Sequence, residues 1–101
     1  MPVTVRIQSR TMIAALSGEI DHHGARAVMD ALDRAISTHL PLRMEVDLSG
    51  VTFMDSSGLA LLIRTHRAVQ GLGGSLRVTH IPAQPRRVLD AAGLSRIIPM
   101  E

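Results

Sequence analysis

The stretch that decides the fold is residues 46–59, which read Val46-Asp47-Leu48-Ser49-Gly50-Val51-Thr52-Phe53-Met54-Asp55-Ser56-Ser57-Gly58-Leu59. Apolar and polar residues alternate at its start, which predicts a strand, and Ser49-Gly50 predicts a turn before a second short apolar patch. Residues 55–58 then open a predicted helix, where backbone N–H groups lack partners and the helix dipole is positive. A phosphate on Ser56 would meet a favourable field there and would add about two negative charges. The stretch therefore indicates a switch in which Ser56 is the modified residue.

The residues before this stretch predict a hairpin and a helix. Residues 3–7 alternate and residues 12–16 form an apolar run, so the two strands are expected to pair antiparallel across a short gap. A loop then ends in Asp21, a preferred type of helix N-cap. The helix is expected to end near Thr38-His39, because Pro41 disfavours helical conformation at the residue before it. Its predicted buried stripe comprises Ala25, Val28, Met29, Leu32, Ala35 and Ile36.

Strands and helices continue to alternate through the rest of the chain. Residues 42–48 alternate apolar and charged side chains, which predicts a strand and helices on only one side of the sheet. A helix over residues 56–70 is ended by the glycine-rich residues 71–74. Residues 76–81 predict a further strand, a proline-rich start predicts a short helix, and residues 96–98 predict a last strand. The core predicted around the central helix comprises Phe53, Met54, Leu59, Leu62, Ile63, His66 and Val69.

The order of these elements predicts the fold class. Strands that are joined through single helices lie parallel, with right-handed crossovers. An α/β fold follows, with a mixed four- to five-stranded sheet, an antiparallel hairpin at the N-terminus and helices mainly on one face. The chain has 101 residues, a length that suits one core, so residues 1–101 are predicted to form a single domain.

Composition argues against several classes of function. All eleven basic residues are Arg, and Lys, Tyr and Cys are absent, so the pI of about 11.0 reflects missing titratable groups at a net charge of only +2. The arginines are dispersed and Phe53 is the only aromatic residue, so nucleic-acid binding is not expected. With no apolar run of bilayer length and no leader-like start, the expected location is the cytoplasm, without a membrane partner and as a monomer.

The chain as a whole resembles one known family. Residues 47–59 resemble the signature of the STAS domain family, and in particular of its bacterial anti-sigma factor antagonists. Residues 18–23 resemble the first loop of that family, and Gly73-Gly74 and residues 87–94 resemble its later elements. The resemblance implies the STAS fold and a regulatory protein rather than an enzyme.

The resemblance also implies partners and a modification. In the family, an anti-sigma factor with a GHKL-type serine kinase fold binds the unphosphorylated antagonist and releases its sigma factor. The same kinase uses ATP to phosphorylate the antagonist, which breaks the complex, and a PP2C-type phosphatase resets the switch. The family's acceptor is the serine directly after the Asp, which is Ser56 in this sequence.

The residues expected to bind the partner surround Ser56. Taken alone, a serine at a helix start is usually a cap, and Ser57 is expected to be an auxiliary one. Asp55 either caps the helix or faces the partner, and Asp21 combines a cap with a contact expected from the family loop. Apolar or charged residues beyond the first turn are predicted at the surface, where a partner would dock. The full predicted set is Asp21, Asp55, Ser56, Ser57, Gly58, Leu61 and Arg64.

No catalytic, cofactor or metal site is predicted. The sequence offers no nucleophile with a base and an orienting group, and residues 71–74 follow a helix rather than precede one, unlike a phosphate-cradling loop. His22 and His23 are adjacent and point in different directions, without further ligands at suitable spacing. His66 is expected to be partly buried and hydrogen-bonded. The alternative function is a fixed, unphosphorylated STAS subunit of a transporter or signalling assembly.

Overall fold

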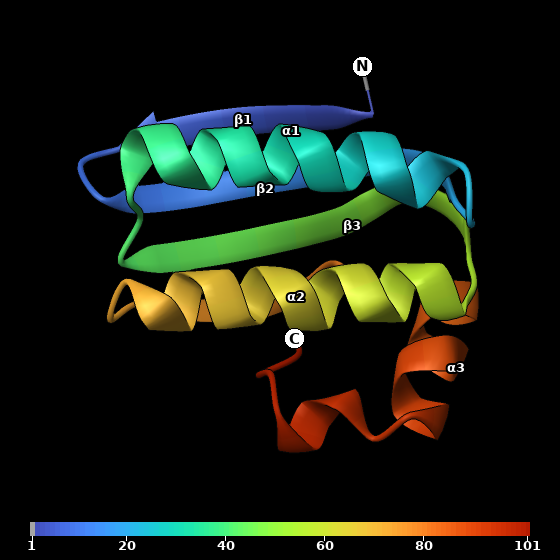
Figure 1. The fold of residues 1–101 in the computed structure, drawn as a ribbon. Helices are drawn as coiled ribbons and strands as arrows, with labels where there is room; N and C mark the ends of the chain where they lie inside the picture. Colours follow the sequence, from blue (N-terminus) through green and yellow to red (C-terminus); the bar gives the residue numbers. More distant parts are fainter. Residues whose placement is uncertain (1) are drawn as a thin grey trace.

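A computed structural model describes residues 2–101 as four strands and three helices (Figure 1). In chain order the elements are β1 (Val3–Gln8), β2 (Thr11–Ile20), α1 (Gly24–His39), β3 (Arg43–Met54), α2 (Ser56–Gly71), β4 (Ser75–Thr79), α3 (Ala83–Ala91) and a 3-10 turn at Leu94–Arg96. The strands form one sheet in the order β1-β2-β3-β4. The β1-β2 pair is antiparallel and the other two pairs are parallel, which confirms the predicted mixed α/β sheet.

The two long helices lie side by side on one face of this sheet, and the opposite face is open (Figure 1). Strand β3 buries three side chains beneath the helices, those of Met44, Val46 and Leu48. The residues that alternate with these along the strand, Glu45 and Asp47, face the open side of the sheet. Helix α3 packs against β3 and α2. The sharp apolar and polar alternation of β3 therefore does reflect a sheet covered on one side.

Strand β3 is longer than predicted and contains no turn at Ser49-Gly50. Its pairing with β2 moves from Ala15↔Asp47 to Ser17↔Gly50, and a second shift precedes Glu19↔Phe53. At each shift β3 carries one extra residue, which is a β-bulge. A Cβ at Gly50 would lie 3.1 Å from the Leu16 carbonyl oxygen. Glycine here permits close approach of two strands, and the predicted loop after residue 16 is likewise part of β2.

The prediction of a last strand over residues 96–98 is wrong. Gly93 adopts a left-handed conformation (φ 68°) and starts the 3-10 turn instead. Strand-like pairing occurs a little later, where the Val78 N–H donates to the Pro99 carbonyl and the Glu101 N–H donates to the Val78 carbonyl, both at 2.9 Å. The chain thus forms an isolated bridge between Val78 and Met100 rather than a fifth strand.

Two predictions of burial near the central helix are also wrong. Leu61, expected at the surface, is 0% exposed, and its neighbour one turn later, Thr65, is buried as well. Helix α2 contacts the sheet, α1 and α3, so its buried sector is wider than one stripe. Phe53, expected in the core, is 42% exposed, because Met54 next to it faces the core and successive strand residues point to opposite faces. Among residues 2–101, no helix is long and apolar enough to cross a bilayer.

Candidate functional site

Ser56 is the first residue of α2 and is exposed at the helix N-terminus. The N-cap is Asp55, whose Oδ1 accepts a hydrogen bond from the Ser57 N–H at 2.7 Å. Ser57 is half-buried and contributes its backbone rather than a capping hydroxyl. Of the two adjacent hydroxyls, that of Ser56 is therefore the more accessible. Because the first-turn N–H groups lie beside it, an anion attached there would be stabilised.

Gly58 holds the first turn of α2 tightly against the end of β3. A Cβ on this residue would overlap the side chain of Met54, with its Sδ at 2.9 Å. Met54 is fully buried, and side chains in protein cores are closely packed. Gly58 was predicted to contact the partner, but it is itself buried, and in the structure it packs closely against Met54 beneath Ser56.

The backbone of Met54 is held by a side chain from α3. Gln84 Oε1 accepts a hydrogen bond from the Met54 N–H, and Gln84 Nε2 donates one to the Met54 carbonyl, both at 2.8 Å. Strand β4 pairs with β3 only as far as Asp47, so the Gln84 amide satisfies groups that a neighbouring strand would otherwise bind. It thereby fixes the backbone two residues before Ser56. Sequence analysis gave no signal for this contact, because a single Gln in a short helix has no distinguishing pattern.

The loop that contains Asp21 lies beside the start of α2. Ile20 pairs with Met54 in the sheet, and the Asp55 N–H donates to the Ile20 carbonyl at 3.4 Å. Asp21 and Asp55 thus each come directly after one of these two paired residues. Asp21 Oδ1 accepts hydrogen bonds from the N–H groups of His23 (3.0 Å) and Gly24 (2.8 Å). The bond from Gly24 is the main reason that the pKa of Asp21 is lowered.

A groove of about 620 Å³ separates the first turns of α1 and α2. Its polar wall includes His22, His23 and Arg26 from one side and Ser57 and Arg64 from the other. Its remaining lining residues are Ala25, Met29, Asp30 and Ala60. Of the predicted set, Gly58 and Leu61 are buried, and the remaining five residues are exposed or half-buried.

Two apolar side chains near Ser56 were missed by sequence analysis. Phe53 is exposed at the end of β3, and Leu59 is only half-buried one helical turn after Ser56. Residues three apart on a helix share a face, so Leu59 lies on the side of α2 that carries Ser56. The three-residue spacing from Ser56 to Leu59 indicates that both lie on one face of α2. Residues 59–63 are all apolar, however, so the sequence does not show which side of the helix faces solvent.

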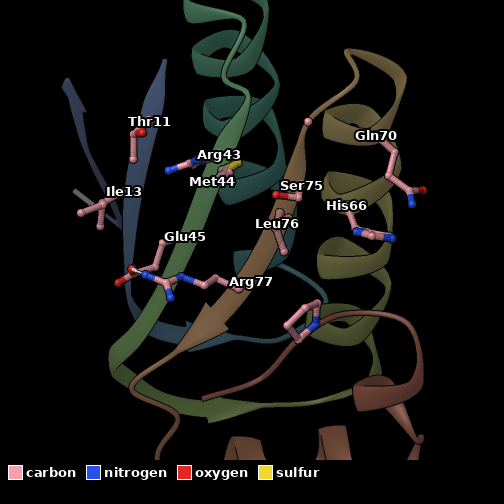
Figure 2. A pocket seen from close by; sticks show the side chains of 12 residues that line it. Thr11, Ile13, Arg43, Met44, Glu45, His66, Gln70, Ser75, Leu76 and Arg77 are labelled. Carbon is pink, nitrogen blue, oxygen red and sulfur yellow. Dashed lines mark hydrogen bonds and ion pairs between the residues drawn. The ribbon is translucent and has the colours of Figure 1, made fainter. Parts of the chain in front are cut away.

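A second cavity, of about 530 Å³, lies along β4 toward the C-terminal end of α2 (Figure 2). His66 and Gln70 approach it from the helix, and Leu76 and Pro99 also line it. His66 is 8% exposed, and no residue in the described range hydrogen-bonds to its Nδ1. The prediction of a hydrogen-bonded, partly buried His66 is therefore wrong for this nitrogen. This cavity lies about ten residues along α2 from Ser56, or roughly 15 Å at 1.5 Å per residue.

The chain belongs to the STAS domain family, whose model matches residues 2–101. It is 34% identical over 89 residues to the "Anti-sigma F factor antagonist" of Paenibacillus polymyxa, covering 88% of this chain and 76% of the relative. A crystal structure of an anti-sigma factor antagonist from Mycobacterium paratuberculosis is 28% identical, with a TM-score of 0.86 over 97% of this chain and 82% of that one. The unphosphorylated form of the antagonist SpoIIAA has the same fold at 22% identity, with a TM-score of 0.82 over 98% of this chain and 87% of that one. SpoIIAA of Bacillus has also been solved in a phosphorylated form, with a TM-score of 0.74 at the same identity and 98% and 90% coverage.

Proposed function

We propose that this protein is an anti-sigma factor antagonist whose binding is switched by phosphorylation of Ser56. The observation that carries the proposal is the exposed Ser56 hydroxyl at the capped start of α2. It is supported by the names of the relatives and by the existence of SpoIIAA in both phosphorylated and unphosphorylated forms.

The surroundings of Ser56 suit a switch that acts by charge rather than by refolding. A phosphate at this position gains from the helix dipole and the nearby N–H groups, so α2 is expected to remain intact. It also adds about two negative charges next to Asp55, which already carries one. In a complex, those charges would be removed from water next to the carboxylate of Asp55. Such burial costs several kcal/mol, enough to weaken affinity by orders of magnitude.

The proposed contact surface surrounds Ser56 on three sides. Asp21 lies on the β2–α1 loop, Phe53 and Leu59 supply apolar area, and Arg64 supplies a charge in the wall of the groove. Arg64 is exposed and forms an ion pair with Asp33 (3.0 Å), which is weak enough at the surface to be exchanged for a partner contact. A mixed apolar and charged surface of this kind is typical of a regulated protein–protein interface.

The partners proposed are those implied by the family. They are an anti-sigma factor with a GHKL-type serine kinase fold, which binds the unphosphorylated form and then phosphorylates it, and a PP2C-type phosphatase. The protein itself is a monomeric cytoplasmic binding module and supplies no catalytic group. Its phosphoryl-acceptor hydroxyl is activated by the kinase.

The experiment that tests this proposal is intact-mass measurement with site mapping after incubation with ATP and the candidate kinase-fold protein of the same genome. We expect one phosphate on Ser56, together with loss of the complex. A Ser57→Ala variant is the matched control and should still be phosphorylated, whereas Ser56→Ala should not. A stable complex without phosphate would contradict the proposal and would favour the fixed-subunit alternative.

A further inference from the structure

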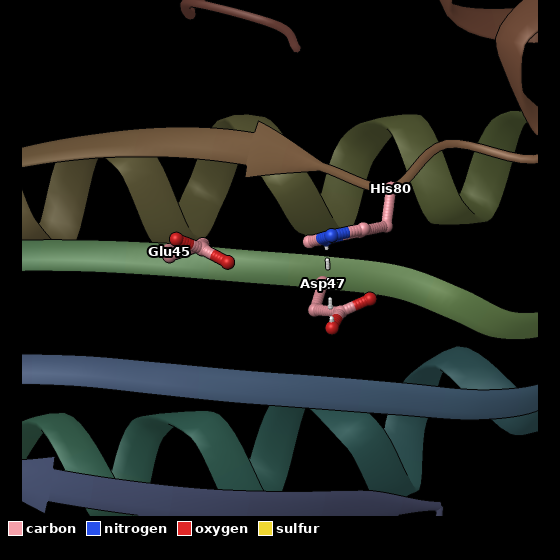
Figure 3. Close-up of side chains that lie close together, drawn as sticks. All are labelled: Glu45, Asp47 and His80. Atoms are coloured by element: carbon pink, nitrogen blue, oxygen red, sulfur yellow. Dashed lines mark ion pairs between the residues drawn. The ribbon is translucent and has the colours of Figure 1, made fainter.

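A second cluster of reactive side chains lies on the open face of the sheet, away from α1 and α2 (Figure 3). Glu45 and Asp47 project from β3, and His80 follows the end of β4. One potential ligand atom from each of the three lies within 4.8 Å of the others. Thr79 lies between them, with its Oγ1 2.9 Å from Glu45 Oε2 and 3.1 Å from His80 Nδ1. The cluster combines carboxylate, hydroxyl and imidazole donors.

Each carboxylate in the cluster is oriented through one of its two oxygens. Arg77 Nη2 binds Glu45 Oε1 at 2.9 Å, and the Ser49 N–H donates to Asp47 Oδ1 at 2.8 Å. The second oxygens, Oε2 and Oδ2, face Thr79 and His80. Outer hydrogen bonds that fix ligand orientation in this way are a regular feature of metal sites. The two inward oxygens are thus held in place, while Arg77 pairs with the outer oxygen of Glu45.

The spacing of the inward atoms suits one divalent ion. His80 Nδ1 lies 3.6 Å from Asp47 Oδ2, and Thr79 Oγ1 lies 2.9 Å from Glu45 Oε2 and 3.1 Å from His80 Nδ1. The ligand atoms of Glu45, Asp47 and His80 all lie within 4.8 Å of one another. With metal–ligand bonds of about 2.1 Å, neighbouring ligands lie about 3.0 Å apart in an octahedron and about 3.4 Å apart in a tetrahedron. Imidazole together with carboxylate oxygen suits Zn²⁺, Mn²⁺ or Co²⁺ better than Ca²⁺ or Mg²⁺.

Cationic side chains already face the two carboxylates of the cluster. The side chains of Glu45 and Asp47 are only 16% and 22% exposed. Burial alone would raise the pKa of Asp47, but hydrogen bonds with Ser49 and the charges of His80 and Arg6 outweigh it and lower the pKa. The cationic side chains facing the pair are Arg77, Arg6 and, when protonated, His80.

We propose that Glu45, Asp47 and His80 bind a divalent transition-metal ion, with Thr79 at its edge and water in the remaining positions. The site is separate from the Ser56 switch, since none of its residues lines the groove between α1 and α2 near Ser56. The side chain of His80 is 63% exposed, which gives an ion direct access from solvent.

The test is titration of the full chain with Zn²⁺ by calorimetry and with Co²⁺ by visible absorption. We expect one equivalent to bind, and we expect His80→Ala to weaken binding at least about tenfold. His39→Ala, which removes an exposed histidine at the end of α1, is the matched control and should bind as the wild type does. Equal affinity of wild type and His80→Ala would overturn the proposal. Loss of binding in a variant that carries His22→Ala and His23→Ala but retains His80 would overturn it as well.

Discussion

Ser56 and Ser57 are neighbours in the sequence but differ in what surrounds them. Ser56 is exposed, whereas Ser57 is half-buried and donates its N–H to the Asp55 carboxylate. The family pattern predicted an acceptor at Ser56 and an auxiliary cap at Ser57, but it did not predict the exposure of either side chain, which depends on the cap geometry. The same holds for Leu59 and Leu61, which hydropathy does not distinguish although only Leu61 is fully buried.

The first prediction concerns the charge at residue 56. Ser56→Ala should bind the kinase-fold partner in the presence of ATP without being released, because it takes no phosphate. Ser56→Glu should bind at least about tenfold more weakly, since it places a negative charge in the interface. Affinity is measured by calorimetry, with Ser57→Ala as the control. Equal affinities of the alanine and glutamate variants at residue 56 would contradict the switch.

The second prediction concerns the contact between Gly58 and Met54. Gly58→Ala should destabilise the protein by about 1–3 kcal/mol, because its Cβ would overlap the buried Met54 side chain. Gly71→Ala is the matched control in the same helix. Its Cβ would meet nothing within 4 Å, so it should be neutral or stabilising by up to about 1 kcal/mol. Urea unfolding measures both, and similar effects at the two positions would show that the close contact is not decisive.

At the scale of whole elements, periodicity located all the α-helices and strands of the described structure. It also predicted a strand over residues 96–98 that does not form. It misplaced the ends of β2 and β3, because a bulge breaks the two-residue period and makes a continuous strand resemble a strand, a turn and a short patch. It also missed how α3 is attached, since the contact between Gln84 and Met54 joins residues thirty positions apart. Patterns within one segment carry no information on such pairs.

The third prediction tests this attachment of α3 to β3. Gln84→Ala leaves the Met54 N–H and carbonyl without their partner and should destabilise the protein by about 1–3 kcal/mol. Hydrogen exchange at the Met54 amide should become faster than at core amides of β3. Gln70→Ala, which removes an exposed side chain of α2, is the control. Unchanged exchange at Met54 would contradict the proposed role of Gln84 in fixing the backbone before Ser56.

For the molecule as a whole, the sheet separates two surfaces of different chemistry. The helical side carries the core and the start of α2, and the open side carries ion pairs such as Arg77 with Glu45. The sequence predicted one polar face for β3 from its alternating charges. It gave no indication that His80 and Asp47 would meet, because that contact depends on the register between β3 and β4.

The fourth prediction is a dependence of stability on pH that originates on the open face. Because the pKa of Asp47 is lowered in the folded state, the unfolded chain binds more protons near pH 4. The stability that Asp47 contributes is therefore complete above its ordinary pKa of about 3.9 and is lost as pH falls through the lower folded value. Asp47→Asn should remove this part, expected to be below about 1 kcal/mol.

Urea unfolding at pH 7 and pH 3 measures the effect. The difference in free energy of unfolding between the two pH values should be smaller for Asp47→Asn than for the wild type. Asp30→Asn, which changes an exposed carboxylate on α1, serves as the control and should leave the difference unchanged. The same difference in all three proteins would show that Asp47 does not contribute.

Because Phe53 is exposed, it offers a natural position for a spectroscopic probe. The chain contains one Phe and no Trp or Tyr, so incorporation of fluorophenylalanine would label a single position. That position is 42% exposed and three residues before Ser56. One fluorine resonance would then distinguish free, partner-bound and phosphorylated protein in a mixture, and would follow the whole cycle in real time without a fused tag.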